Sequence, residues 1–466
     1  MTDSQKNIRR MFIKYGSVWQ AILLIVIAVL IWRIYFPAIM SPDSIDQYGQ
    51  ALEGKFVDWH PPLMSIVLSA IFKIGGGIGT LIFIQCLAAL FGLRSALSLA
   101  LRFFSDRKMS KQISQLIAVV CAVVFLIPFL TPFMFISVIF WKDAWLAIML
   151  LWIISYLIWL FLNLESFSQR IFIIHILALS LISAAMVLVR HNAFVIIPVI
   201  SLIIAAFGKI KFGKVGLAFG ALPVLIAFSI NPIVDSVFNV QHVKAGNLVV
   251  ASDLTTMLML YPELKPEYPA TIRHKNNPRP KPKDLIIELG SDNIELQNEY
   301  EKTLSAHPAQ FLSVKLYRFG QMLSVENGLK QKLAYDIIVN QYGLKINDDH
   351  REIRYKLDSL SAETGNRWYF VWISGLHVIW LSLNIIFAVY FLRKVFRQKD
   401  LNAVFSFLLF LIPLSYYFSY LLAATTPDYR FMYPATLLMQ VYVISFMLNK
   451  ILTISKKSKS SFQPES

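Results

Sequence analysis

Charged residues and cysteines are scarce in this chain of 466 residues. Only 15% of the residues are charged, against about 25% in an average soluble domain, and 56% are hydrophobic. The two cysteines, Cys86 and Cys121, lie in apolar runs, so the chain has no disulfide framework. It also lacks a collagen-type glycine period and any repeat of about 20–50 residues, which excludes fibrous and solenoid folds. One or two soluble cores could not bury this much apolar surface, so the composition indicates a polytopic membrane protein.

The distribution of the excess positive charge indicates membrane topology and not nucleic-acid binding. The net charge is +16, from 44 Lys and Arg against 28 Asp and Glu. The hydrophilic stretch 233–368 is neutral, so the whole excess lies in the apolar remainder. There the basic residues cluster at the ends of apolar runs, as in 102–111 and at the C-terminus. This is the positive-inside pattern of cytoplasmic loops, and no nucleic-acid partner is expected.

About ten apolar runs approach the length of about 20 residues that a bilayer crossing needs. They are 18–37, 79–101, 112–130, 143–162, 171–188, 193–208, 213–232, 369–392, 402–423 and 431–450. The first is interpreted as an uncleaved signal anchor, because no small-residue cleavage site follows it. An extra stretch, 61–74, is expected to lie at the membrane surface, since a crossing there would place the basic loop 102–111 outside. The predicted fold is an all-α polytopic helix bundle with both termini in the cytoplasm.

This topology divides the chain into four regions. They are a seven-span module, 1–232, with an outer loop at 41–78; a mostly helical extracytoplasmic domain, 233–368; three C-terminal spans, 369–450; and a basic cytoplasmic tail, 451–466. In the outer domain 249–261 and 309–323 have helical patterning, and the Pro-rich 277–283 does not. Lys315 and Arg318 could meet an anionic acceptor, although a solvated helix face is the commoner explanation. The short outer segments hold several acids and the cytoplasmic loops lack a complete GxxxxGK[ST] motif, so we expect chemistry on the outer face.

The first outer loop combines a helix signature with polar residues. Ser41 and Pro42 are typical of a helix N-cap and first turn, and Gly54 of its end. The helix would place Asp43, Asp46, Gln47 and Gln50 on one face. Asp43 could merely complement the helix dipole, but this leaves the other polar residues and the following Asp58-Trp59-His60 unexplained. Ionisable groups at a membrane boundary are usually functional, which favours a polar reaction site.

These motifs resemble the GT-C glycosyltransferases, which take a sugar from a polyprenyl-phosphate carrier on the outer or lumenal face. The resemblance rests on a single span followed by Pro42-Asp43-Ser44, then Asp58-Trp59-His60-Pro61-Pro62, a large outer loop after seven spans, and the late segment 426–434, similar to a PDYRY-type motif. Protein O-mannosyltransferases and lipid A aminoarabinose transferases are relatives of this kind. The resemblance implies that Asp43 is the catalytic base and Asp143 a second acid.

Sugar transfer from a lipid phosphate needs a general base and cations for the leaving group. The catalytic candidates are Asp43, Asp143 and Asp58. The substrate-binding candidates are Asp46, Gln47, His60, Lys142, Arg190, Tyr429, Arg430 and Tyr433. His60 could equally cap the turn that follows it, and the basic residues could snorkel to lipid headgroups. A divalent metal is possible only if Asp43, Asp46, Asp58 and Asp143 converge.

The sequence therefore predicts a membrane glycosyltransferase that moves a sugar from a polyprenyl-phosphate donor to an extracytoplasmic glycan or lipid acceptor, with inversion. The Phe- and Lys-rich composition favours a bacterial inner membrane, with the active site on its periplasmic face. A polysaccharide polymerase or ligase is an alternative that would favour Arg and His in the large loop over acids in the first. A transporter or flippase is a third possibility, but the predicted spans are nearly free of charge at their centres.

Overall fold

The computed structural model describes most of the chain and consists of helices. The described residues are 3–105, 108–128, 130–243, 246–267, 294–323, 336–357, 359, 376–398, 400–424 and 428–461. Within them the only β-structure is three isolated bridges, such as Val57 with Gln241. The predicted stretch 277–283 and the end of the large loop, 360–368, lie outside the described residues. The all-α prediction is confirmed for the described part of the chain.

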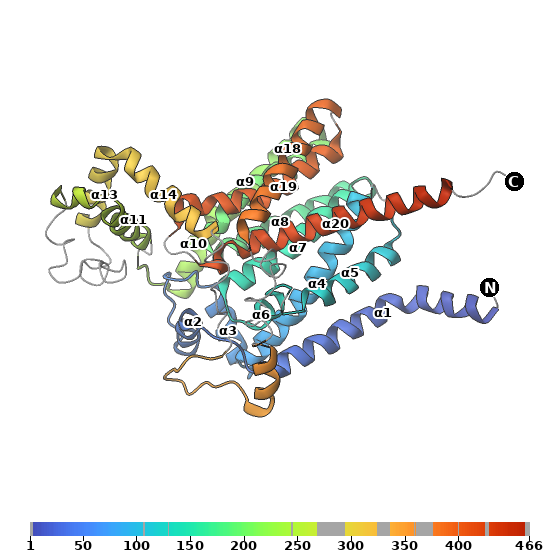
Figure 1. Cartoon of the computed structure of the whole chain (residues 1–466), viewed down its shortest axis with the longest axis horizontal. Coiled ribbons are helices and arrows are strands. Elements are labelled where there is room, and N and C mark those ends of the chain that lie inside the picture. The colour runs from blue at the N-terminus through green and yellow to red at the C-terminus, as the bar shows by residue number, and fades with distance from the viewer. Residues whose placement is uncertain are drawn as a thin grey trace.

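Eight helical segments of the described residues are long and apolar enough to cross a membrane. They comprise α1 (Asp3–Ile34), α4 (Ile78–Phe104), α7 (Lys142–Leu162), α8 (Gln169–Val189), a continuous segment from His191 to Phe238, α18 (His377–Gln398), α19 (Leu401–Ala423) and α20 (Tyr429–Ser461). Of these, α7 is buried along most of its length, whereas α1 lies at the edge of the bundle (Figure 1). Most of the predicted spans therefore correspond to one of these helices, and α7 lies at the core.

The continuous segment His191–Phe238 corresponds to two predicted spans, because it reverses direction. It consists of η2 (His191–Ile196), α9 (Ile197–Phe212), η3 (Gly213–Gly220) and α10 (Ala221–Phe238). The reversal begins at Gly213, whose φ of 64° is a left-handed conformation that glycine adopts readily. A Cβ atom on Gly208 would lie 2.1 Å from the carbonyl oxygen of Gly216, so glycine allows η3 to pack directly on α9. The predicted break between 208 and 213 is thus a tight hairpin.

Two of the apolar stretches that were considered as membrane spans form short helices. α5 (Lys111–Phe125) has 15 residues and ends before Pro128, so the prediction of a span over 112–130 was wrong in its length. α3 (Leu63–Lys73) has 11 residues. At 1.5 Å per residue it is about 16 Å long, roughly half the hydrocarbon thickness. This confirms that 61–74 does not cross as a helix.

The remaining helices gather at the end of the bundle opposite to both chain termini, which we call the outer end (Figure 1). They are α2 (Pro42–Glu53), α6 (Phe133–Val138), α11 (Asn247–Leu260), α13 (Ile294–Ala306) and α14 (Pro308–Leu323), with the short 3₁₀ turns η4 (Pro262–Glu267) and η5 (Asp348–His350). The turn η1 (Leu164–Ser166) instead connects the C-terminus of α7 to α8, at the other end of the bundle. α11, α13 and α14 form the outer domain. The expected helices over 249–261 and 309–323 are confirmed, and α14 packs on α19 through stacked Phe319 and Phe418 rings.

Candidate active site at the outer end

The first outer loop folds as its sequence predicts and is fixed to the start of α7. The Ser41 hydroxyl accepts a hydrogen bond from the amide of Ser44. Pro42 begins α2, and Gly54 ends the helix in a left-handed conformation. The indole of Trp141 donates to the Ser41 hydroxyl at 2.8 Å, and the Ser44 hydroxyl donates to the carbonyl of Phe140 at 2.5 Å. The N-terminus of α2 therefore lies beside the N-terminus of α7.

This contact places Asp43 among side chains from three other elements. Its Oδ2 lies 3.0 Å from the guanidinium of Arg430 at the start of α20, and its Oδ1 lies 3.8 Å from Nε2 of His60. Nδ1 of His60 is in turn 2.8 Å from Nζ of Lys142 in α7. We call Asp43, His60, Lys142 and Arg430 the outer cluster. The structure thus brings together four residues that the sequence predicted from separate segments.

The protonation of His60 follows from its neighbours. Burial, together with the nearby charge of Lys142, lowers the pKa of His60 to about 3, so the ring is neutral at physiological pH. An ammonium has only donors, so Nδ1 must accept from Lys142 and the ring proton must lie on Nε2. That Nε2–H group faces the Asp43 carboxylate. His60 is therefore neutral, with its Nε2–H group directed toward Asp43 at 3.8 Å, and Asp43 is the anion of the cluster.

Opposing effects act on the Asp43 carboxyl group. Burial alone would raise its pKa, but the charge and hydrogen bond of Arg430, with the charge of Lys142, lower the pKa of Asp43 below its usual value. About a third of the side chain, 33%, remains exposed. Asp43 is thus an ionised carboxylate that a ligand from outside the protein can reach.

Arg430 is held by groups on both sides and is not directed to lipid. Its Nε lies 2.8 Å from Asp428, and its guanidinium is 5.2 Å from the ring centroid of Trp141. Burial raises the pKa of Asp428, and Arg430 offsets part of this effect. The snorkelling alternative therefore does not describe this residue. Its contact with the neighbouring Asp428 agrees with the sequence, whereas its contact with Trp141 could not be read from the sequence.

Asp143 and Arg190 form a second pair that is closed to solvent. Their closest atoms are 2.5 Å apart, as an ion pair that is not aligned as a hydrogen bond, and the Asp143 side chain is only 1% exposed. Arg190 donates to the hydroxyl of Tyr420 at 3.0 Å and lies 4.7 Å from the ring of Phe431. Both predicted site residues thus lie behind the outer cluster, where they support α19 and α20. Sequence reasoning missed Tyr420 and Phe431 because nothing in their spacing distinguishes them from core aromatics.

Asp58, predicted as a catalytic candidate, contacts the connection after α10 and no member of the outer cluster. Its carboxylate accepts the amide of Val243 at 2.7 Å and lies 2.8 Å from Nδ1 of His242, both on the connection after α10. The adjacent Val57 forms a β-bridge with Gln241. These bonds assign Asp58 the role of fixing the first outer loop to that connection.

The other predicted residues divide between surface and core. Asp46 is exposed and accepts from Gln50 at 2.9 Å, so these two residues share a face of α2 as expected, although Gln47 and Gln50 are buried. Tyr433 is fully buried within α20. The side chain of Tyr429 lies outside the described residues.

The four acids considered for a metal do not converge. Asp43, Asp46, Asp58 and Asp143 contact Arg430, Gln50, His242 and Arg190 respectively. In the described part of the chain no group of three or more His, Cys, Asp or Glu side chains could hold a metal ion. The condition set for a divalent metal is therefore not met by these residues.

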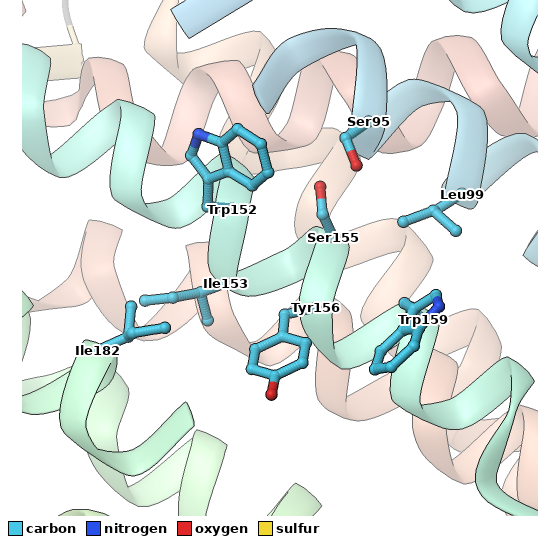
Figure 2. A pocket seen from close by; sticks show the side chains of 8 residues that line it. All are labelled: Ser95, Leu99, Trp152, Ile153, Ser155, Tyr156, Trp159 and Ile182. Carbon is cyan, nitrogen blue, oxygen red and sulfur yellow. The ribbon is translucent and has the colours of Figure 1, made fainter. Parts of the chain in front are cut away.

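Two cavities lie away from the outer cluster. One of about 260 Å³ is lined by Trp152, Tyr156 and Trp159 of α7 with residues of α4 and α8 (Figure 2). It begins some ten residues along α7 from Asp143, or about 15 Å. The other, of about 530 Å³, lies between α1 and α5. Both lie between helices of the bundle, and neither is lined by a residue of the outer cluster.

Comparison of the chain with family models, with curated proteins and with solved structures finds no match to any of them.

Proposed function

We propose that this protein is an integral-membrane glycosyltransferase that moves a sugar from a polyprenyl-phosphate donor to a hydroxyl of an extracytoplasmic glycan or lipid. The observation that supports it most strongly is the contact of a partly exposed carboxylate, Asp43, with an arginine, Arg430, at one end of an apolar helix bundle. A base and a phosphate-binding cation are the two groups that such a transfer requires side by side.

The reaction is a single displacement. The acceptor hydroxyl oxygen attacks the anomeric carbon, its proton passes to the Asp43 carboxylate, and the bond from that carbon to the phosphate oxygen breaks. The polyprenyl phosphate leaves with the extra negative charge. One carboxylate suffices because the phosphate is already a good leaving group, whereas a glycosidase needs two.

Arg430 would link the two halves of this reaction. In the structure it contacts Asp43, where it keeps the carboxylate ionised but weakly basic. A guanidinium group binds phosphate through two parallel hydrogen bonds, so the phosphate of an arriving donor would draw Arg430 away from Asp43. Asp43 would then become more basic when the donor is present. Lys142, whose described partner is the neutral His60, is the second cation near this position.

The test is sugar transfer by Asp43→Asn in membranes or vesicles with labelled polyprenyl-phosphate sugars. We expect a loss of about 100-fold or more, the usual contribution of a general base, with donor retention unchanged. Glu53→Gln is a matched control, because Glu53 is exposed on the same helix and only contacts Lys55, at 4.0 Å. Full transfer by Asp43→Asn, with the wild type active, would exclude Asp43 as the base.

A wild type that transfers sugar from no monophosphate donor would count against the function itself. A donor panel with different sugars and chain lengths, and acceptors from whole cell envelopes, makes that negative result informative. The panel also includes diphosphate-linked oligosaccharides, because transfer from these donors alone would favour the polymerase or ligase alternative.

A further inference from the structure

We propose that a buried ion-pair cluster in the outer domain, formed by Asp253, Lys315 and Arg318, positions the outer cluster by fixing the end of α19. The catalytic part of this inference rests on the proposed function, and the structural part does not. Asp253 lies on α11, and Lys315 and Arg318 lie on α14. All three were absent from the predicted site, and the two cations were expected to face solvent or an acceptor.

The cluster is dry and fully paired. Nζ of Lys315 is 2.5 Å from Oδ2 of Asp253, and a guanidinium nitrogen of Arg318 is 2.9 Å from Oδ1. The hydroxyl of Tyr300 in α13 also donates to Asp253, at 3.2 Å. Arg318 further donates to Thr256 at 2.9 Å and to the carbonyl of Ser252. Each of the three charged side chains is less than a tenth exposed, so an external acceptor does not reach them.

The same two cations reach out of the outer domain to the last turn of α19. Lys315 donates to the carbonyl of Leu422 at 2.6 Å, and Arg318 donates to the carbonyl of Ala424 at 3.0 Å. Carbonyls at a helix C-terminus lack partners within the helix and carry the negative end of its dipole. Two cations that are themselves fixed by Asp253 therefore hold this helix end against the outer domain.

The held segment leads directly to the candidate active site. Tyr420, one turn before the bonded carbonyls, receives the hydrogen bond of Arg190, which pairs with Asp143. A few residues after them, Asp428 and Arg430 begin α20, and Arg430 contacts Asp43. The Tyr420 bond with Arg190 and the start of α20 with Arg430 thus lie on either side of the helix end that Lys315 and Arg318 hold. Loosening this end should let Arg430 move away from Asp43.

The experiment compares the wild-type full chain with two cluster variants. Lys315→Met removes one anchor. A triple variant, Asp253→Leu with Lys315→Met and Arg318→Met, removes the whole charged set, because apolar replacements of a complete buried ion cluster are commonly tolerated. Gln297→Ala is the control, since Gln297 joins α13 to Asn247 of α11 at 3.2 Å without contact to α19.

Two readouts separate positioning from general stability. In amide hydrogen exchange, residues 422–424 and the first turns of α20 should exchange about tenfold faster or more in the cluster variants, and at the wild-type rate in Gln297→Ala. In transfer assays, kcat should fall about tenfold or more, and the acid side of the pH profile should move to higher pH, because Asp43 without Arg430 recovers a higher pKa. A variant that is only less stable would lose active protein without this shift in the profile.

Unchanged exchange of residues 422–424 and of the start of α20 in a folded triple variant would overturn the inference. Faster exchange with an unchanged kcat and pH profile would overturn its catalytic part. If exchange rises in the variants but the wild type transfers no sugar from any donor, the proposed function fails, while the anchoring of α19 is supported.

Discussion

Two aspartates of this protein have similar partners and opposite surroundings. Asp43 lies 3.0 Å from Arg430 and 3.8 Å from His60, and Asp253 lies 2.5 Å from Lys315 and 2.9 Å from Arg318. The Asp43 side chain is 33% exposed, whereas that of Asp253 is 1% exposed. The first has room for a ligand, and the second has none.

Their pKa values diverge accordingly. Burial raises the pKa of Asp253, and the two cations offset only part of this rise. Burial also acts on Asp43, but there the neighbouring positive charges prevail and its pKa is lowered. A carboxylate with cations nearby is therefore not by itself a reaction site. Partial exposure, together with partners that a ligand could replace, distinguishes the candidate base from the structural acid.

The largest effect on stability should come from replacing the buried aspartate, Asp253. Asp253→Asn leaves Lys315 and Arg318 buried without their anion, which typically costs about 3–5 kcal/mol. Asp43→Asn should cost about 1 kcal/mol or less, since Asp43 is itself partly exposed and Arg430 keeps Asp428 as a second anionic partner. Unfolding in detergent, followed by denaturant titration or melting temperature, measures both. Equal losses for the two variants would remove the distinction between them.

Arg430→Gln should have the next largest effect, and on activity more than on stability. Loss of a cation that stabilises a leaving phosphate costs about 100-fold or more in kcat. The variant also removes the charge that lowers the pKa of Asp43, so this pKa rises. Because Asp43 acts when ionised, activity should then be lost at a higher pH as the solution is acidified. The pH dependence of kcat/KM measures this shift. An unchanged acid side of the profile would contradict the contact between Arg430 and Asp43.

His60→Gln tests whether the imidazole beside Asp43 and Lys142 is neutral. Since the pKa of His60 is lowered to about 3, this ring does not titrate between about pH 5 and 8. We expect the shape of the pH profile over that range to stay unchanged and the rate to fall by about fivefold, the value of the one hydrogen bond that the ring makes with Lys142. Disappearance of an ionisation near the ordinary histidine pKa would show that the ring is charged in the working enzyme.

Local rules predicted the helices better than the contacts between them. Ser41, Pro42 and Gly54 act within one turn of chain, and the bounds of α2 follow them. Charge distribution across loops likewise indicated that 61–74 does not cross, and the 11 residues of α3 agree. The length of α5 was missed because apolar composition continues through the turn at Pro128, where the helix has already ended.

The site was predicted in its residue types and only in part in its arrangement. Asp43, His60, Lys142 and Arg430 were each chosen because polar groups at helix ends near a membrane are costly, and the fold brings all four together. The same reasoning selected Asp143 and Asp58, which satisfy that cost by pairing with Arg190 and His242. Which partner an acid finds depends on tertiary packing. No spacing in the sequence states that Asp253 of α11 would meet Lys315 and Arg318 of α14.

Asp58→Asn should have the smallest effect. It tests whether Asp58 only fixes the first outer loop, in contrast to the proposed base Asp43. The hydrogen bond and charge of Asp58 raise the pKa of the exposed His242. A raised folded-state pKa means that the protonated ring contributes stability fully below its unfolded pKa, near 6.5, and that this contribution is lost as pH rises through the folded pKa. Asp58→Asn should weaken this dependence, seen as melting temperature against pH, because only the more distant Asp235 then raises the pKa of His242, and it should change transfer by about twofold or less. A loss of transfer as deep as that of Asp43→Asn would return Asp58 to the reaction, because a support on the exposed side of the loop cannot account for it.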